Sequence, residues 1–336
     1  MKTKLLSLVA LVPLFAFSQY SNGGLSTGPT AKNGTAAPAG YTWSEVQNNT
    51  GNTTESNTTA GYTAALFGTT NFFLADDFII PAGQSWQVSS IDVFAYQTGY
   101  TGSTSPFNVL RLSISNGNPS VAGSTIVFGD DTTNRFTAGV DATMYRVFNT
   151  MVPTPSATTT TRKIWKLTGS APVTLAAGTY WLKYQFQSAV TTVGGFTPPV
   201  TIPGSRGLPA FNGIQYDATN AIWTPLVDDG NPTSAPDYTM DLPFIINYTV
   251  LGTNENVQFD NRVVVYPNPV KDIFKLNLPA ESQRAGTTVS VYDMSGKLVK
   301  TMPYGDSYNV SDLAKGSYML KVNDGLNKKV AKMIKQ

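Results

Sequence analysis

The chain has 336 residues, a formal net charge of +2, and neither cysteine nor histidine. The lack of cysteine excludes disulfide bonds, thiolate zinc sites and cysteine nucleophiles. The lack of histidine excludes the Ser-His-Asp triad, imidazole metal ligands and the commonest general base. Only 13% of the residues are charged, while 11% are aromatic. This composition favours a β-rich extracellular protein with a packed core over a helical or a disordered one.

The first 18 residues have the pattern of a secretion signal peptide. Two lysines provide its positive charge, and residues 5–17 are an apolar stretch too short to span a bilayer. Small side chains at Ala16 and Ser18 predict cleavage before Gln19. An uncleaved membrane anchor is the alternative, but no stop-transfer pattern follows. Since no other segment approaches about 20 apolar residues, we expect no transmembrane span in the mature chain.

Residues 19–68 are rich in glycine, threonine and asparagine and show no apolar periodicity. We expect an extended or loosely ordered arm, because this segment lacks the apolar pattern of a packed element. Its Asn-x-Thr triplets match glycosylation acceptors, although the composition of the segment explains them equally well.

Residues 69–250 are expected to form the main domain, a large antiparallel β-sandwich of jelly-roll type. About ten runs of β-branched and aromatic residues are separated by turn-forming residues, with no convincing helical period. The Pro-Ala-Gly sequence at 81–83 is expected to turn the chain after the first strand. The expected strands cover residues 72–80, 86–96, 107–115, 125–128, 145–148, 164–167, 179–187, 214–223 and 242–250.

The charge of this domain excludes one class of partner. Residues 19–250 carry 9 Lys and Arg against 13 Asp and Glu. A mildly acidic domain has no basic patch to neutralise phosphates, so we expect no nucleic-acid partner.

Three pairs of adjacent aspartates occur in the main domain, at 76–77, 130–131 and 228–229. Adjacent side chains on a strand point to opposite faces, so no pair is by itself a catalytic acid and base. Asp130, Asp131 and nearby Asn134 supply loop oxygens of the kind that calcium prefers. Calcium is therefore the one candidate cofactor, and turn formation is the more common role of such residues.

Tryptophans are the candidate ligand-binding residues. Alternation in residues 179–187 places apolar side chains on one face and Trp181, with polar neighbours, on the other. A tryptophan on a polar face can stack on a sugar ring. We take Trp86, Trp181 and Trp223 as the candidates. Burial inside the sandwich is the alternative, because tryptophan is highly buried on average.

Several motifs of the main domain resemble a recurring extracellular bacterial module. They include residues 75–78 (ADDF), 129–135 (GDDTTNR) and 175–182 (LAAGTYWL). The resemblance spans roughly residues 70–248. The module is of uncertain function and is fused to different surface-sorting signals, so the resemblance implies one domain and no particular activity.

A polar segment, residues 251–261, is expected to link the main domain to a smaller one. Residues 262–336 hold six or seven short alternating runs separated by turns, which predicts a small immunoglobulin-like β-sandwich. Residues 256–336 are basic, with 12 Lys and Arg against 7 Asp and Glu.

Several motifs of this last segment, in order, resemble the type A C-terminal sorting domain of type IX secretion cargo in Bacteroidetes-type bacteria. The resemblance covers about residues 260–336. An unrelated small β-sandwich is the alternative, since this architecture is shared widely. The matching residues are Tyr266, Pro267, Asn268, Pro269, Asp293, Gly296, Gly316, Tyr318, Lys332 and Lys335.

This resemblance implies a route and a set of partners. The signal peptide would bring the chain to the periplasm, and the outer-membrane type IX secretion machinery would then recognise the tail. In the family the tail is commonly removed near its start, and the cargo is attached to surface lipopolysaccharide or released. We therefore expect an extracellular or surface-attached protein. The lysines of the last run either assist recognition or protect an edge strand from aggregation.

Three functions remain for the main domain. A non-catalytic surface module for adhesion or ligand binding is favoured, because histidine, cysteine and a convincing carboxylate pair are all lacking. A carbohydrate-binding domain is the alternative, since the aromatic strands suit glycans. A glycoside hydrolase using aspartates alone is the second alternative. We therefore expect that the protein is not an enzyme.

Overall fold

The computed structural model describes residues 18–55, 58–148, 158–230, 232–251, 263–278, 286–293, 297–323 and 328–336. Two compact units divide the chain, Met1–Leu251 and Gly252–Gln336. They are called the large unit and the small unit below, and each is described by itself. Almost all of the predicted signal peptide and of the predicted linker lies outside the described residues.

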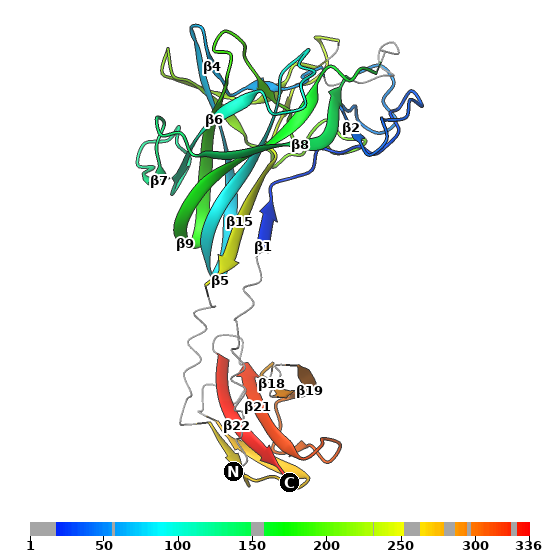
Figure 1. The fold of residues 1–336 in the computed structure, drawn as a ribbon. Helices are drawn as coiled ribbons and strands as arrows, with labels where there is room; N and C mark the ends of the chain where they lie inside the picture. The colour runs from blue at the N-terminus through cyan, green and yellow to red at the C-terminus, as the bar shows by residue number, and fades with distance from the viewer. Residues whose placement is uncertain are drawn as a thin grey trace, which may run out of the picture. The chain divides into compact units, whose positions relative to one another are not determined.

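Strands make up all the regular structure described in the large unit (Figure 1). The expected all-β class is therefore confirmed. Across the described ranges, no helix is long and apolar enough to cross a membrane. Thirteen strands form one sheet, and β13 pairs with β14 alone. The strands are β1 (Ser18–Ser21), β2 (Thr42–Glu45), β3 (Tyr62–Thr63), β4 (Leu66–Phe67), β5 (Thr70–Tyr96), β6 (Phe107–Ser115), β7 (Ile126–Gly129), β8 (Phe136–Val147), β9 (Lys163–Ser188), β10 (Phe196–Thr197), β11 (Ile214–Asp217), β12 (Ile222–Pro225), β13 (Val227–Asp228), β14 (Tyr238–Thr239) and β15 (Phe244–Val250).

Two very long strands organise this unit. β5 has 27 residues and β9 has 26, and they pair antiparallel along almost their whole length. The turn expected at 81–83 is a bulge within β5, where the register shifts between Ile80 and Ser85. Pro81 has no amide to donate and Gly83 has a φ of 81°, so the ladder is interrupted locally. β9 stays paired on both sides of the bulge, so the chain continues as one strand.

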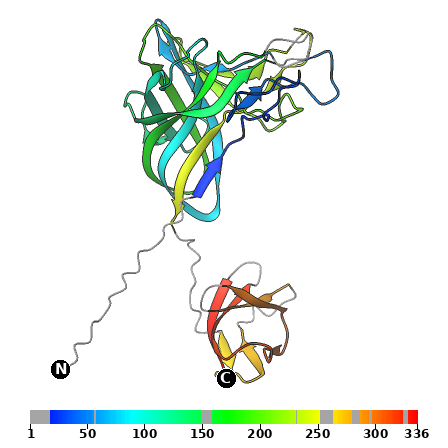
Figure 2. The same cartoon turned by 45° about the vertical axis from the view of Figure 1, so that its right-hand side comes forward.

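The sheet folds over on itself around these two strands. The beginning of β5 and the end of β9 belong to a layer with the order β12-β11-β5-β9-β6-β7. Their other halves belong to a second layer, β1-β15-β5-β9-β8-β2. Side chains from both halves of β5, such as Phe78 and Val93, share one buried core. Figure 2 shows the curvature of the long strands from a second side.

The expectation of a loosely ordered arm is wrong for described residues 18–55. β1 pairs antiparallel with β15, and β2 pairs in parallel with β8. Trp43 of β2 is only 2% exposed and packs with Tyr145 of β8. The partner strands lie about 100 or more residues away in the sequence, so no local sequence pattern predicts the pairing.

A buried arginine explains how such a polar segment is held. Arg146 of β8 is fully buried, and its Nε donates to the carbonyl of Ala60 at 2.8 Å. Its Nη1 donates to the hydroxyls of Ser44 at 3.1 Å and Thr201 at 2.8 Å. Burial lowers the pKa of Arg146 to about 10, so the guanidinium stays charged at neutral pH. One cation therefore fixes three separate segments through hydrogen bonds.

A second buried arginine fixes the loops beside β13 and β14. The Nε of Arg206 donates to the carboxylate of Asp228 at 2.7 Å, and both side chains are 0% exposed. The ring of Tyr238 lies 4.8 Å from the guanidinium carbon. The amide of Gly230 donates to the other carboxylate oxygen at 3.1 Å. A buried pair of this kind is costly to break from one side, because the remaining charge is left without compensation.

The small unit is a sandwich of two antiparallel sheets, as expected. Their orders are β16-β17-β20 and β19-β18-β21-β22. Both sheets contribute to one core, which contains Phe274, Val291 and Leu320. The strands are β16 (Val264–Tyr266), β17 (Ile273–Asn277), β18 (Thr288–Asp293), β19 (Leu298–Pro303), β20 (Tyr308–Asn309), β21 (Gly316–Asn323) and β22 (Lys328–Lys335).

The buried ion pair gives a test with a neighbouring control. Asp228→Ala should lower the free energy of unfolding by about 3–5 kcal/mol, because it removes the fully buried carboxylate that binds Arg206 and leaves Glu55, 3.8 Å from Nη1, as the remaining acidic neighbour among the described residues. Asp229→Ala removes the adjacent, exposed carboxylate and should change it by less than about 0.5 kcal/mol. Urea unfolding followed by circular dichroism measures both. Equal effects of the two substitutions would contradict this assignment.

Candidate functional site: a pocket on the outer face of the large unit

One face of the β12-β11-β5-β9-β6-β7 layer points away from the core. Successive residues of a strand face opposite sides, so paired residues show which side chains share this face. Tyr216 pairs with Trp223 on one side and with Phe73 on the other. Two residues along, Lys183 pairs with Ser113. An aromatic row and a polar row therefore lie next to each other on the outer face.

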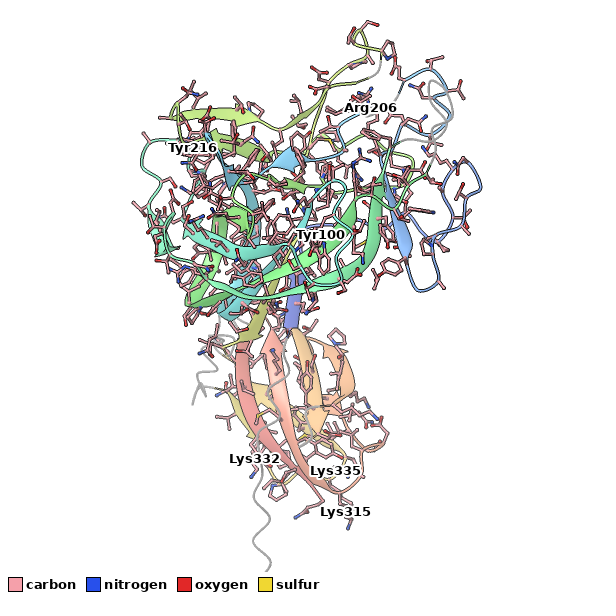
Figure 3. All side chains as sticks on the ribbon, turned by 45° about the horizontal axis from the view of Figure 1, so that its top comes forward. Tyr100, Arg206, Tyr216, Lys315, Lys332 and Lys335 are labelled. Carbon is pink, nitrogen blue, oxygen red and sulfur yellow. The ribbon has the colours of Figure 1, made fainter. Side chains whose placement is uncertain are left out.

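A cavity of about 290 Å³ opens over this face. Five strands and two loops contribute to it, so residues far apart in the sequence meet there. Figure 3 marks Tyr216, which stands away from the buried Arg206 in that view. The lining residues are Ser113, Ser115, Pro119, Ser124, Ile126, Asp131, Lys183, Tyr216 and Trp223.

Ring stacking and one ion pair fix the geometry of the pocket. The rings of Tyr216 and Trp223 are stacked, with centroids 4.6 Å apart and an interplanar angle of 28°. The Lys183 ammonium lies 5.1 Å from the centre of the Phe73 ring and 5.7 Å from that of Tyr216. It also donates to Oδ2 of Asp131 at 2.7 Å. The cation is therefore held by three neighbours, which pre-organises the pocket.

Of the three predicted tryptophans, the structure places only Trp223 in the pocket. The predicted alternation of β9 is correct, and Trp181 does lie on the outer face. However, it is only 6% exposed, because Ala75, Ile214 and Trp223 pack with it. Trp86 is 2% exposed and stacks on Tyr248 with centroids 3.9 Å apart. Assigning Trp86 and Trp181 to ligand contact was wrong, since neighbouring strands cover both rings.

The predicted calcium site is not assembled. Oδ1 of Asp130 accepts hydrogen bonds from the amides of Thr132 and Thr133, at 2.8 and 2.6 Å. Oδ2 accepts from Arg135 at 2.9 Å. The amide hydrogen bonds hold the pKa of Asp130 well below its usual range. Both oxygens therefore stabilise a turn, which is the more common role named above.

The other two predicted ligands are also engaged. Oδ1 of Asn134 accepts from the amides of Leu110 and Phe136, at 3.1 and 3.0 Å. Asp131 turns to Lys183 and the pocket instead. Within the ranges that the structure describes, no cluster of three or more acidic side chains is placed to hold a metal ion.

The aspartate pairs do not form an acid and base across a groove. Asp76 is fully buried, and its Oδ2 accepts from the amide of Leu242 at 2.7 Å and from Asn22 at 3.0 Å. Burial, followed by the charge of Asp241, raises its pKa well above the usual value. Asp228 is buried against Arg206, as described above. Each pair thus has one member committed to the fold.

The predicted sorting residues cluster around the last strand of the small unit. Tyr266 is 72% exposed. Two residues on, Asn268 donates to the carbonyl of Lys332 at 3.0 Å and accepts from the amide of Ile334 at 2.9 Å. Pro267 and Pro269 flank it, each after a cis peptide bond. The Tyr-Pro-Asn-Pro segment is therefore hydrogen-bonded to the edge strand β22.

The remaining sorting residues shape the turns of the same sheet. Asp293 accepts from the amide of Lys297 at 3.1 Å, and the Tyr318 hydroxyl donates to the carbonyl of Ala314 at 2.8 Å. Gly316 begins β21 and pairs with Lys335. Gly296 lies outside the described residues.

The two predicted lysines of β22 face opposite sides (Figure 3). Lys332 is exposed, whereas Lys335 is only 8% exposed and its Nζ donates to the carbonyl of Gln336 at 2.8 Å. Ile334 is 39% exposed on the outward side. The outward surface of this strand is therefore mixed rather than uniformly basic.

Sequence reasoning missed Tyr216, Ser113 and Lys183 as members of one site. The alternation of residues 179–187 does assign Lys183 to the polar face of that strand. Only the register of β9 against β6 and of β5 against β11 brings Ser113 and Lys183 to the aromatic pair. No local signal in the sequence contains that register.

Comparison with known proteins identifies the small unit. Residues 264–336 match the family described as the secretion system C-terminal sorting domain. This confirms the resemblance to type IX secretion cargo, and with it export to the cell surface or beyond. No curated protein matches the sequence.

Two solved structures show weak likeness. PorZ, a surface component of the type IX secretion system of Porphyromonas gingivalis, is 16% identical over 46% of this chain, with a TM-score of 0.19. The match covers 20% of the PorZ chain, about a fifth of its length. The adhesin domain of Epf from Streptococcus pyogenes is 7% identical over 79% of this chain and 76% of its own, with a TM-score of 0.17. These TM-scores are too low for either likeness to bear on the fold or function of this chain.

The hydrogen bonds between Asn268 and β22 predict a local change in hydrogen exchange when Asn268 is replaced. In Asn268→Ala the amide of Ile334 loses its acceptor, so its exchange should become at least about tenfold faster. Asn309→Ala is the control, because Asn309 caps a different turn of the same unit, at Ser311. Hydrogen exchange of the full chain by mass spectrometry measures both. Unchanged protection of the Ile334 amide in Asn268→Ala would contradict this hydrogen bond.

The half-buried carboxyl group of Asp241 predicts a pH dependence of stability. Burial, with the charge of Asp77, raises the pKa of Asp241 to about 6, above that of an unfolded aspartate. Its contribution to stability is therefore complete below about pH 4 and is lost as the pH rises through about 6. Asp241→Asn keeps an oxygen for the Asn212 amide, which Asp241 accepts at 2.7 Å, but cannot ionise.

Urea unfolding between about pH 4 and about pH 7 tests this dependence. The parent chain should lose stability over that range, and Asp241→Asn should lose less. An identical pH profile for the two chains would contradict the raised pKa.

Proposed function

We propose that the protein is exported by the type IX secretion machinery and that its large unit is a non-catalytic ligand-binding module of the cell surface. The sorting domain supports the first half of this proposal. The pocket on the outer face, with its stacked Tyr216–Trp223 pair, is the observation that carries the second half.

Export would proceed in two steps. The N-terminal signal would deliver the chain to the periplasm. The machinery would then recognise the small unit, and cleavage within residues 252–261 would remove it. The large unit is left either attached to surface lipopolysaccharide or released. Strand β22, which Asn268 holds by hydrogen bonds, and the exposed Tyr266 give the machinery a defined surface to recognise.

Binding is favoured over catalysis by the carboxylates of the large unit. Glycoside hydrolysis needs two carboxyl groups about 5–10 Å apart across the sugar, one of them acting as an acid. Asp131 is the one carboxylate among the described residues that line the pocket, and Lys183 is bound to it. No second carboxyl group lies opposite it in the described lining of the pocket. A glycoside hydrolase is therefore the weaker proposal.

Cell fractionation tests export. The full chain should yield a species outside the cell or on its surface that lacks the small unit. A chain that ends at residue 251 should accumulate in the periplasm. Mass spectrometry of surface, medium and periplasmic fractions distinguishes these outcomes. Export of the truncated chain, or retention of the full chain in the cytoplasm, would contradict the proposal.

The non-catalytic role predicts no turnover. Incubation of the exported large unit with neutral and acidic polysaccharides should release no new reducing ends. If they were released and Asp131→Asn abolished the release, the module would be an enzyme and the proposal would fail.

A further inference from the structure

We infer that the pocket between β6, β7, β9, β11 and β12 binds a neutral saccharide, with Trp223 as the stacking platform. This inference rests on the proposed binding role and names the class of its ligand. It draws on ring geometry, unused hydrogen-bonding groups, charge balance and size.

The aromatic pair suits one face of a sugar ring. Trp223 is half-buried and lines the cavity, and its stacking on Tyr216 at 4.6 Å limits its movement. Buried Trp181 packs with it. A sugar presents C–H groups on one face of its ring, and a fixed aromatic surface covers them at little entropic cost.

Polar groups around the pair still have hydrogen-bonding capacity. Oδ1 of Asp131 is buried and has no partner among the described residues. The hydroxyls of Ser115 and Ser124 donate to the carbonyl of Gly117, at 2.8 and 2.9 Å, which leaves their lone pairs free to accept. Sugar hydroxyls are both donors and acceptors, so they match this set. An unpaired buried oxygen is costly, and a ligand that donates to it gains affinity.

The charge balance favours a neutral ligand. Lys183 is the only cation among the described residues that line the pocket, and Asp131 neutralises it at 2.7 Å. An acidic sugar would have to compete with that carboxylate and would be repelled by it. A neutral sugar can bind without disturbing the pair.

The size of the cavity limits the ligand. About 290 Å³ lies at the lower end of the range for small-molecule sites, which corresponds to about one or two sugar rings. Exposed Ile126 stands at the rim, 57% exposed, beside Pro119. The pocket therefore fits a terminal or short segment of a glycan rather than a long chain.

A glycan array of neutral and acidic oligosaccharides tests this inference, followed by titration calorimetry with the best neutral ligand. The full chain should bind neutral glycans. Trp223→Ala should weaken that binding at least about tenfold, whereas Trp223→Phe should retain part of it. Ile222→Ala is the matched control. Ile222 precedes Trp223 on β12, faces the other side and is 54% exposed, so its loss should leave affinity unchanged.

A second variant tests the charge balance without removing a ring. Asp131→Asn preserves the shape of the side chain and leaves Lys183 uncompensated. It should weaken binding of neutral glycans and create binding to acidic ones, a change of selectivity that loss of folding would not produce.

Three results would overturn the inference. They are binding to acidic glycans alone by the parent chain, neutral binding that survives in Trp223→Ala, and no glycan binding at all. None of these results would contradict the proposed export or the proposed absence of turnover. Those two proposals are tested separately, by fractionation and by reducing-end release. Failure of the ligand class and failure of the proposed function are therefore distinguishable.

Discussion

The continuous pairing of β5 with β9 is the constraint on which the large unit depends. Two strands of 27 and 26 residues remain paired across a bulge, so the same pair serves both layers of the sandwich. A bulge increases local twist and bends a sheet without ending it. The other strands of the main sheet are added outward from this pair, either directly or through a neighbouring strand. The layers, the core and the outer face all follow from its register.

That register also decides which side chains can act together. Leu182 and Tyr184 of β9 face the core, while Lys183 between them faces outward with Ser113 of β6. A shift of one residue would exchange these faces and bury the lysine. The hydrophobic core therefore enforces the polar arrangement of the pocket. Folding and the proposed binding role share one set of backbone pairings.

Buried charged side chains stabilise segments that the apolar core does not hold by itself. Arg146 and Arg206 each bind loops or edge segments through hydrogen bonds, beside apolar contacts such as that of Trp43 with Tyr145. Such contacts are specific in direction, because a buried guanidinium must find its acceptors. The polar, glycine-rich beginning of the chain is ordered in this way. A search for hydrophobic periodicity cannot detect it.

Composition, ordered motifs and a period of two residues are enough to predict the all-β class, the sorting tail and the faces of β9. The composition also excludes cysteine and histidine chemistry. The folded chain alone reveals that Trp181 is covered, that the first segment joins the sheet and that Trp223, Tyr216 and Asp131 share a pocket. Each of these depends on pairing between strands distant in the chain. Such pairing is set by the packing of the whole core and leaves no local trace.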